Sequence, residues 1–229
     1  MSLILQLESS SEISSVALAY QGKLLSVIES DQPNSHTEKL TLLIKECLAQ
    51  AGKVISQLDA VAVSDGPGSY TSLRVGISVA KGICYAKDIP MIAIDSLLIL
   101  ANGIDLTKTE PDDLIIPMID ARRMEIYTSV FNCDLTRLQA TNAIIIENDT
   151  FKSFLVGNRI IHICGSGAIK YYDQHKSEAI KLHHTRTSSS FMSLPSYESY
   201  LNNQYVDVAY YTPNYFKAPN ITKSKSKLL

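Results

Sequence analysis

The stretch from residue 61 to residue 82 constrains the fold of this chain more than any other. An apolar run, Val61-Ala62-Val63, leads into the corner Gly66-Pro67-Gly68, and apolar residues at helical spacing follow. Pro67 fixes its own φ, and the glycine on either side permits backbone angles and close approaches that a Cβ hinders. Ser69 or Thr71 stands where a helix cap accepts a hydrogen bond from an unpaired N–H. The pattern predicts a strand, a tight turn and a helix.

Composition places the chain among soluble globular proteins. Its 229 residues are 45% hydrophobic and 19% charged, which is enough apolar material for a sizeable core. The net charge of −2 provides no global basic field for nucleic acid or membrane. No apolar run approaches the roughly 20 residues of a transmembrane helix, and the N-terminus lacks the basic start of a signal peptide. The four cysteines form no C-x-x-C pair, which favours a reducing cytoplasm.

The first half of the chain predicts the order βββαβαβα. Three short strands are expected before residue 29, because Gln21-Gly22 is a hairpin turn signal between two apolar runs. The capping-box pattern Ser35-x-x-Glu38 opens a helix that Gly52 ends. The three opening strands are expected at 4–7, 14–20 and 24–28. Further strands are expected at 60–64 and 91–94, and helices at 70–87 and 96–101.

A polar segment, residues 102–113, is the best candidate for a linker. The second half then predicts strands at 114–119, 125–131, 143–146 and 160–164, a helix at about 150–155, and weaker helical signals near Tyr171 and at 190–201. We therefore expect an N-terminal domain at 1–103 and a C-terminal domain at 104–219. The lysine-rich segment 220–229 is predicted to be a disordered basic tail.

The amino-acid sequence of this corner, residues 66–82, resembles the signature of the bacterial YeaZ family, also called TsaB. That family belongs to the machinery that makes threonylcarbamoyladenosine on tRNA. Ser72 is the one departure, since the family commonly has a glycine there. The residues that form this structural signature turn are Gly66, Pro67, Gly68, Ser69, Thr71 and Gly76.

Other segments match the same family in order along the chain. They are the opening hairpin, His36 to Leu40, Ile119 to Tyr127, Gly165 to Ala168 and Pro213 to Lys217, whereas 177–204 matches nothing familiar. The resemblance implies an α/β protein with the actin-like ATPase fold, which is ribonuclease H-like. It implies two βββαβα halves, of which the second is degenerate.

The resemblance also implies a role without catalysis. Members of this family act as a scaffold that binds TsaD, of the Gcp/Kae family, and supports the ATPase TsaE. Together they transfer threonylcarbamoyl to adenosine 37 of tRNA, which the scaffold reaches only through the complex. Alone, the scaffold is expected as a homodimer. The residues implied in the partner interface are His36, Leu40, Leu43, Ile44, Cys47, Leu73, Arg74, Ile77 and Lys81. The same apolar stripe fits core packing against the sheet.

A vestigial nucleotide site is the next hypothesis, with Glu8, Ser10, Gly165 and Gly167 as its residues. Glu8 ends the first strand, where actin-like ATPases carry an aspartate. The residues favour a solvated strand-end acid there, because Ser9-Ser10-Ser11 replaces the usual phosphate turn. No P-loop is present, so a structural corner is favoured at Gly66–Ser69 over a phosphate cradle. We expect no cofactor bound tightly by the isolated chain, with ATP and Mg²⁺ at the assembled complex.

Neither a metal site nor a catalytic group is predicted. Leu40 breaks the His-x-x-x-His pair that would begin at His36, and His183-His184 is expected at the surface. Asp120 near Arg122 and Arg123 is expected to form a structural ion pair or an interdomain contact. Two alternatives stay open: a phosphotransferase of the actin-like fold that uses Glu8, and a glycoprotease-like peptidase. No H-E-x-x-H motif or telling Cys/His spacing supports the peptidase.

Overall fold

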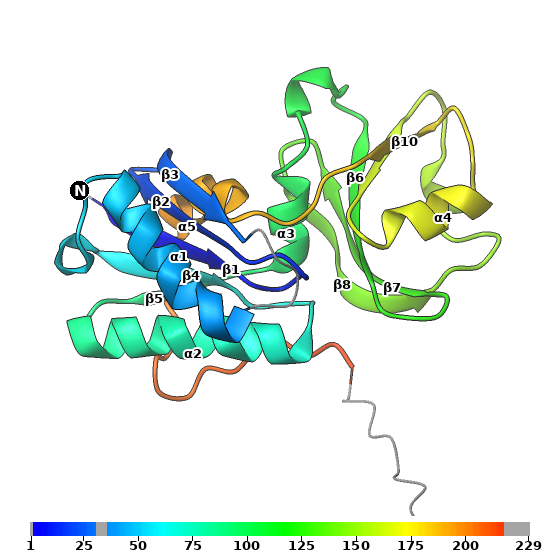
Figure 1. The fold of residues 1–229 in the computed structure, drawn as a ribbon. Coiled ribbons are helices and arrows are strands. Elements are labelled where there is room, and N and C mark those ends of the chain that lie inside the picture. The colour runs from blue at the N-terminus through cyan, green and yellow to red at the C-terminus, as the bar shows by residue number, and fades with distance from the viewer. Residues whose placement is uncertain (1, 31–35, 218–229) are drawn as a thin grey trace, which may run out of the picture.

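Two lobes lie side by side in the computed structural model, which describes residues 2–30 and 36–217 (Figure 1). Each lobe is built on a five-stranded mixed sheet. Within the described residues, no helix has the length and apolar content needed to cross a membrane.

The first lobe contains an antiparallel meander followed by two parallel strands. The meander is β1 (Leu3–Glu8), β2 (Ser15–Tyr20) and β3 (Lys23–Glu29), and β4 (Ala60–Ser64) and β5 (Met91–Ile94) continue the sheet on the other side of β1. The strand order is therefore β3-β2-β1-β4-β5. Both central strands, β1 and β4, are buried along their whole length, as strands covered on both faces should be.

Two helices cover one face of this sheet. They are α1 (His36–Gln50) and α2 (Tyr70–Lys87), and α3 (Ser96–Ala101) follows β5 toward the second lobe (Figure 1). The strand–turn–helix prediction for the corner is confirmed. Ser69 does occupy the N-cap position, but its side chain makes no capping bond, because its hydroxyl oxygen accepts a hydrogen bond from the Ser72 hydroxyl at 2.9 Å.

The second lobe repeats the strand order of the first. Its strands are β6 (Leu114–Asp120), β7 (Glu125–Asn132), β8 (Arg137–Ile145), β9 (Ile161–Cys164) and β10 (Ile180–His183), ordered β10-β9-β6-β7-β8. In both lobes the first strand is central, the next two flank it in antiparallel fashion, and the last two lie parallel on its other side. This shared topology confirms the two-halved fold class.

The second half is degenerate where its first crossover helix should be. The helix predicted at 150–155 is wrong, because only a short 3₁₀ turn, η3 (Lys152–Phe154), is present. Phe151 adopts a left-handed φ of 62°, which prevents a continuous α-helix. Helix α4 (Ala168–Gln174) is present near Tyr171, where a helix was expected.

Two strands of the second lobe depart from the sequence prediction. Strand β8 begins at Arg137 rather than at residue 143, and its first four residues are exposed and lack apolar alternation. Strand β10 was not predicted at all, because four residues with mixed polarity give too short a pattern.

After β10 the chain returns to the first lobe. The 3₁₀ turn η4 (Ser189–Met192) and helix α5 (Ser193–Leu201) pack against the first sheet on the face away from α1 and α2. A single boundary at residue 103, with 104–219 as one domain, does not describe this return. The predicted tail at 220–229 lies outside the described residues.

Leu40 provides a test of the core that α1 forms on the first sheet. Its side chain is fully buried, whereas its neighbour Leu42 is 55% exposed. We expect Leu40→Ala to lower the free energy of unfolding by about 2–5 kcal/mol, since it leaves a cavity. Leu42→Ala is the matched control and should change it by less than about 0.5 kcal/mol. Urea unfolding measures both, and equal effects would contradict the helix orientation.

Candidate functional site at the junction of the two lobes

The glycine turn before α2 rests directly on the loop that follows β1. The backbone N–H of Ser69 donates to the Ser10 carbonyl at 2.8 Å. A Cβ added at Gly68 would lie 2.4 Å from that same carbonyl oxygen, so only glycine allows this approach. The amide that an anion would use at the start of α2 therefore already has a protein partner.

A second close contact joins the same loop to the middle of α2. A Cβ added at Gly76 would lie 2.2 Å from the Ser9 hydroxyl oxygen, and that hydroxyl donates to the Ser72 carbonyl at 2.9 Å. Ser9 thus enters the space that Gly76 leaves. The residues of the signature turn form a packed corner between β1, β4 and α2.

Glu8 is the buried acid of this corner. Its side chain is completely inaccessible, so the expectation of a solvated strand-end acid is wrong. The Ser10 backbone N–H and hydroxyl both donate to Oε1, at 2.6 and 2.5 Å, whereas Oε2 has no partner among the described residues. Burial raises the pKa of Glu8, and the two Ser10 bonds oppose that rise. The loop Ser9-Ser10-Ser11 folds over the end of β1 and covers the carboxyl group of Glu8.

Gly165 and Gly167 lie in the second lobe, after β9. A Cβ at Gly165 would be 2.4 Å from the Met118 carbonyl oxygen, and the Gly167 N–H donates to that carbonyl at 2.9 Å. The nearest neighbours of both glycines come from α3, β6 and β7. Glu8 and Ser10 lie together in the first lobe, and the two glycines pack tightly in the second.

Asp120, Arg122 and Arg123 lie at the tip of the hairpin between β6 and β7. Asp120 pairs with Lys170 at 2.6 Å and accepts the Arg122 backbone N–H at 2.7 Å. The ion pair expected here therefore uses a lysine of α4. Partial burial favours a higher pKa for Asp120, but Lys170 and the Arg122 N–H hold that pKa below its usual value. Arg122 and Arg123 adopt left-handed φ angles of 68° and 51°.

Most residues predicted for the partner interface belong to the core. Their side chains are at most 6% exposed, so they contribute mainly to the core, and of these six only Ile44 also lines the groove described below; they are Leu40, Leu43, Ile44, Cys47, Leu73 and Ile77. Arg74 and Lys81 lie on another side of α2, where each contacts the C-terminal segment of the same chain. The side chain of His36 lies outside what the structure describes.

An apolar groove nevertheless runs between α1 and α2. It has a volume of about 680 Å³. Two of its residues, Val54 and Ile55, are 58% and 42% exposed, although both are large and apolar. The groove is lined by Thr41, Ile44, Lys45, Leu48, Ala49, Lys53, Val54, Ile55, Val79, Gly82 and Ile83. Val54 and Ile55 lie in the segment that follows α1, and an exposed apolar groove of this kind is typical of an interaction site.

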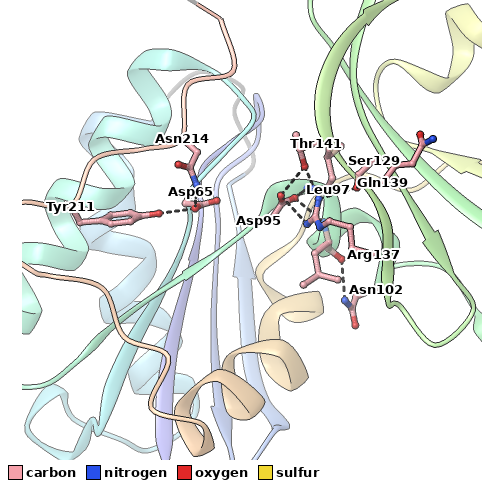
Figure 2. A network of polar contacts seen from close by, with 11 residues as sticks. Asp65, Asp95, Leu97, Asn102, Ser129, Arg137, Gln139, Thr141, Tyr211 and Asn214 are labelled. Carbon is pink, nitrogen blue, oxygen red and sulfur yellow. Dashed lines mark hydrogen bonds and ion pairs between the residues drawn. The ribbon is translucent and has the colours of Figure 1, made fainter.

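A polar cluster joins the two lobes where α3 begins (Figure 2). Asp95 caps α3 by accepting the backbone N–H groups of Leu97 and Leu98. Its other oxygen meets Arg137 at 3.0 Å and accepts the Thr141 hydroxyl at 3.1 Å, both from β8. Because Asp95 belongs to the first lobe and β8 to the second, this cluster joins the two lobes.

Asp65 follows β4, next to Asp95, which follows the adjacent parallel strand β5. The Tyr211 hydroxyl and the Asn214 side-chain amide both donate to Oδ2, at 2.6 and 2.7 Å (Figure 2). Oδ1 has no partner among the described residues. Burial raises the pKa of Asp65 to about 6, with Asp95 adding to the rise and the hydrogen bonds and Arg137 opposing it.

Sequence reasoning did not single out Asp65 or the residues that hold it. A signal was present, because Asn214 belongs to the segment Pro213 to Lys217, which resembles the family's closing motif. That segment touches the signature turn, since the Asn214 N–H donates to the Asp65 carbonyl at 2.8 Å. Two motifs far apart in the chain therefore form one site.

A histidine pair was also missed. The expectation of a surface position for His183 is wrong, because it lies in β10, partly buried, with its Nε2 2.9 Å from Nδ1 of His162. The Nε2 atom of His162 lies 3.1 Å from Asp113. Burial, His162 and Lys181 lower the pKa of His183. In the part of the chain that the structure describes, no three His, Cys, Asp or Glu residues are grouped to hold a metal ion.

Comparison with known proteins identifies the family. The model of the family described as TsaD, tRNA N6-adenosine threonylcarbamoyltransferase, matches residues 24–225. The chain belongs to this family. A curated relative, the tRNA threonylcarbamoyladenosine biosynthesis protein TsaB of Haemophilus influenzae, is 38% identical over 127 residues, which is 55% of this chain and 52% of that protein. The chain thus spans about half the length of the curated relatives it matches, and the resemblance to the YeaZ/TsaB family is confirmed.

Solved structures share the fold over nearly the whole chain. YeaZ from Pseudomonas aeruginosa superposes with a TM-score of 0.77 at 24% identity, covering 94% of this chain and all of that one (100%). The activator of 2-hydroxyisocaproyl-CoA dehydratase from Clostridium difficile, solved with ADPNP, superposes with a TM-score of 0.50 at 10% identity, covering 89% and 96% of the two chains. At these identities the likeness concerns the fold.

Gly68 provides a test of the packed corner. We expect Gly68→Ala to lower the free energy of unfolding by more than about 2 kcal/mol, because the added Cβ meets the Ser10 backbone. Gly82 in α2 is the control, since a Cβ there meets no atom within 4 Å. Gly82→Ala should raise stability by roughly 0.5–1 kcal/mol through helix propensity. Chemical denaturation measures both variants, and a stable Gly68→Ala protein would contradict the close approach.

Proposed function

We propose that this chain is a non-catalytic subunit of the machinery that makes threonylcarbamoyladenosine on tRNA. In this proposal it binds the threonylcarbamoyltransferase TsaD through the groove between α1 and α2, and supports the ATPase TsaE in the assembled complex. It reaches tRNA only through that complex. The names of the curated relatives support the pathway, and the groove is the observation that carries the binding role.

The shape of the groove supports a helical or broad apolar partner surface. Its floor is apolar and made by two helices, while Lys45 and Lys53 stand at its border. The core residues beneath it, such as Ile44 and Leu48, hold the two helices at a fixed spacing. We also propose that two copies of the chain pair through this groove when TsaD is absent, since a twofold dimer would bury the same apolar surface on both copies.

The corner at Glu8 supports a role without catalysis. A carboxyl group with a raised pKa and no solvent access is poorly suited to hold a hydrated cation. The Ser69 amide at the start of α2 is already bonded to Ser10. We therefore place any ATP and Mg²⁺ at the joint surface with the partners. The four cysteines are free, which supports a location in the reducing cytoplasm.

Substitution in the groove tests the docking surface. We expect Val54→Glu to abolish the complex with TsaD of the same organism, and the homodimer, because it places a charge among apolar side chains. Val54 is 58% exposed, so the folded chain tolerates the change. Size-exclusion chromatography with light scattering measures the assembly, and circular dichroism checks the fold.

Leu138→Glu is the matched control for this experiment. Leu138 is equally apolar and 53% exposed, but it lies on β8 in the second lobe. It should leave both assemblies intact. Loss of assembly in both variants, or in neither, would argue against the groove as the docking surface.

Nucleotide binding by the isolated chain tests the alternative of a phosphotransferase. We expect ATP with Mg²⁺ to leave the melting temperature of the isolated chain unchanged, because Glu8 is fully buried and the Ser69 amide is already bonded to Ser10. A melting temperature that rises with the logarithm of ATP concentration would show binding to the folded chain. If Glu8→Gln then abolished that rise, the phosphotransferase reading would replace ours.

A further inference from the structure

The last described segment of the chain, residues 205–217, forms an extended C-terminal strap. It starts beyond α5, where the Val206 N–H donates to the Met91 carbonyl at 3.0 Å on the edge of β5. It then follows α2 along the side of the first lobe (Figure 1, orange to red). The strap therefore covers the sheet edge and runs toward the second lobe.

Polar contacts hold the middle of the strap to the first lobe. Tyr211 and Asn214 bind the carboxylate of Asp65, as described above. Lys81 of α2 donates to the Ala209 carbonyl at 2.9 Å. Only Pro213 is buried within the strap, and Tyr210 is 86% exposed. Val206, Val208 and Tyr211 are only partly buried where they pack against the core of the first lobe, so polar bonds and shallow apolar contacts together hold the strap.

An aromatic and cationic cluster follows at the end of the strap. Arg74 of α2 donates from Nε to the Tyr215 hydroxyl at 2.9 Å and lies over the Tyr70 ring at 4.4 Å from its centre. Lys217 forms an ion pair with Glu125 of β7. Because Tyr70 and Arg74 belong to the first lobe and Glu125 to the second, the end of the strap spans both lobes.

We propose that this strap is a releasable, proton-sensitive latch whose opening frees the lobes to move relative to each other. Tyr211 and Asn214 bind it to Asp65 of the first lobe, and Lys217 binds it to Glu125 of the second lobe. Segments held by few buried apolar contacts open without global unfolding. The Asp95 contacts with Arg137 and Thr141, and the apolar packing of α3 on the second sheet, then remain across the junction. This inference does not depend on the proposed function.

Asp65 makes the latch sensitive to protons. The charged or titratable groups that face it are Tyr211 from the strap, Asp95 from the start of α3 and Arg137 from β8. Burial is the largest cause that raises its pKa from 3.8 to about 6. Burial also raises the pKa of Tyr211, so this hydroxyl stays protonated as a donor.

The direction of the pH effect follows from linkage. An acid with a raised pKa in the closed state binds its proton more tightly there than after opening, when it is solvated. Protonation therefore favours the closed strap below about pH 4, and this stabilisation is lost as the pH rises through about 6. The shift in the pKa of Asp65 from 3.8 to about 6 limits the size of this effect. The equilibrium constant for opening rises by at most roughly 100-fold between about pH 4 and a pH well above 6.

Hydrogen exchange of the Asn214 amide, followed by NMR on the full chain, tests the latch. This N–H donates to the Asp65 carbonyl and reports opening directly. After correction for intrinsic exchange, we expect its protection to be lower than that of β4 amides, and to fall by up to about 100-fold as the pH rises from 4 to 8. Tyr211→Phe should lower its protection by roughly 10- to 100-fold at neutral pH, since a bond to a charged group is lost.

Two matched variants separate the latch from a merely structural strap. Asp65→Asn keeps an oxygen acceptor for Tyr211 and should remove the pH dependence of Asn214 protection. Tyr210→Phe changes the exposed neighbouring tyrosine and should behave as the unmodified chain. The proposal is overturned if Asn214 exchanges only in step with β4, or if the pH dependence survives in Asp65→Asn.

The freedom of the lobes is measured separately, by the distance between spin labels on cysteines placed at Leu25 and Leu138. These exposed positions lie on β3 and β8, in different lobes, and Cys133→Ser removes the one cysteine that is not buried. We expect Tyr211→Phe combined with Lys217→Met to broaden the distance distribution. An unchanged distribution while Asn214 loses protection would show that the strap opens without freeing the lobes, which contradicts the proposal.

Discussion

The contact between the loop Ser9-Ser10-Ser11 and the glycine turn Gly66–Ser69 is the one on which the rest of this structure depends. Ser10 offers its carbonyl to the Ser69 N–H, and Gly68 lies so close that a Cβ would not fit. This one approach joins the end of β1 to the start of α2 and buries Glu8 beneath it. It turns a corner suited to an anion into a closed structural joint.

The two lobes show the same topology but different degrees of completion. Both sheets have their first strand at the centre, yet the second lobe replaces its first crossover helix with the short turn η3. Their junction is held by the Asp95–Arg137 pair and by Lys217 of the strap, which pairs with Glu125. Buried apolar side chains of α3 also pack against the second sheet, so the junction combines polar ties with an apolar contact.

Helix α2 connects these features. Its inner face builds the core, one side lines the apolar groove with Val79 and Ile83, and another side carries Arg74 and Lys81 toward the strap. The groove and the strap therefore lie on opposite sides of one helix.

The sequence by itself determined the strands, the two main helices and the glycine corner of the first lobe, because apolar periodicity and turn residues are local signals. It also indicated the family through motifs that stand far apart in the chain. Only the tertiary structure decided which apolar residues reach the surface, since a core stripe and a surface stripe have the same spacing: Leu43 is buried, whereas Val54 is exposed. It alone placed Asn214 on Asp65 and sealed Glu8 from water, because both depend on packing between segments that the chain separates.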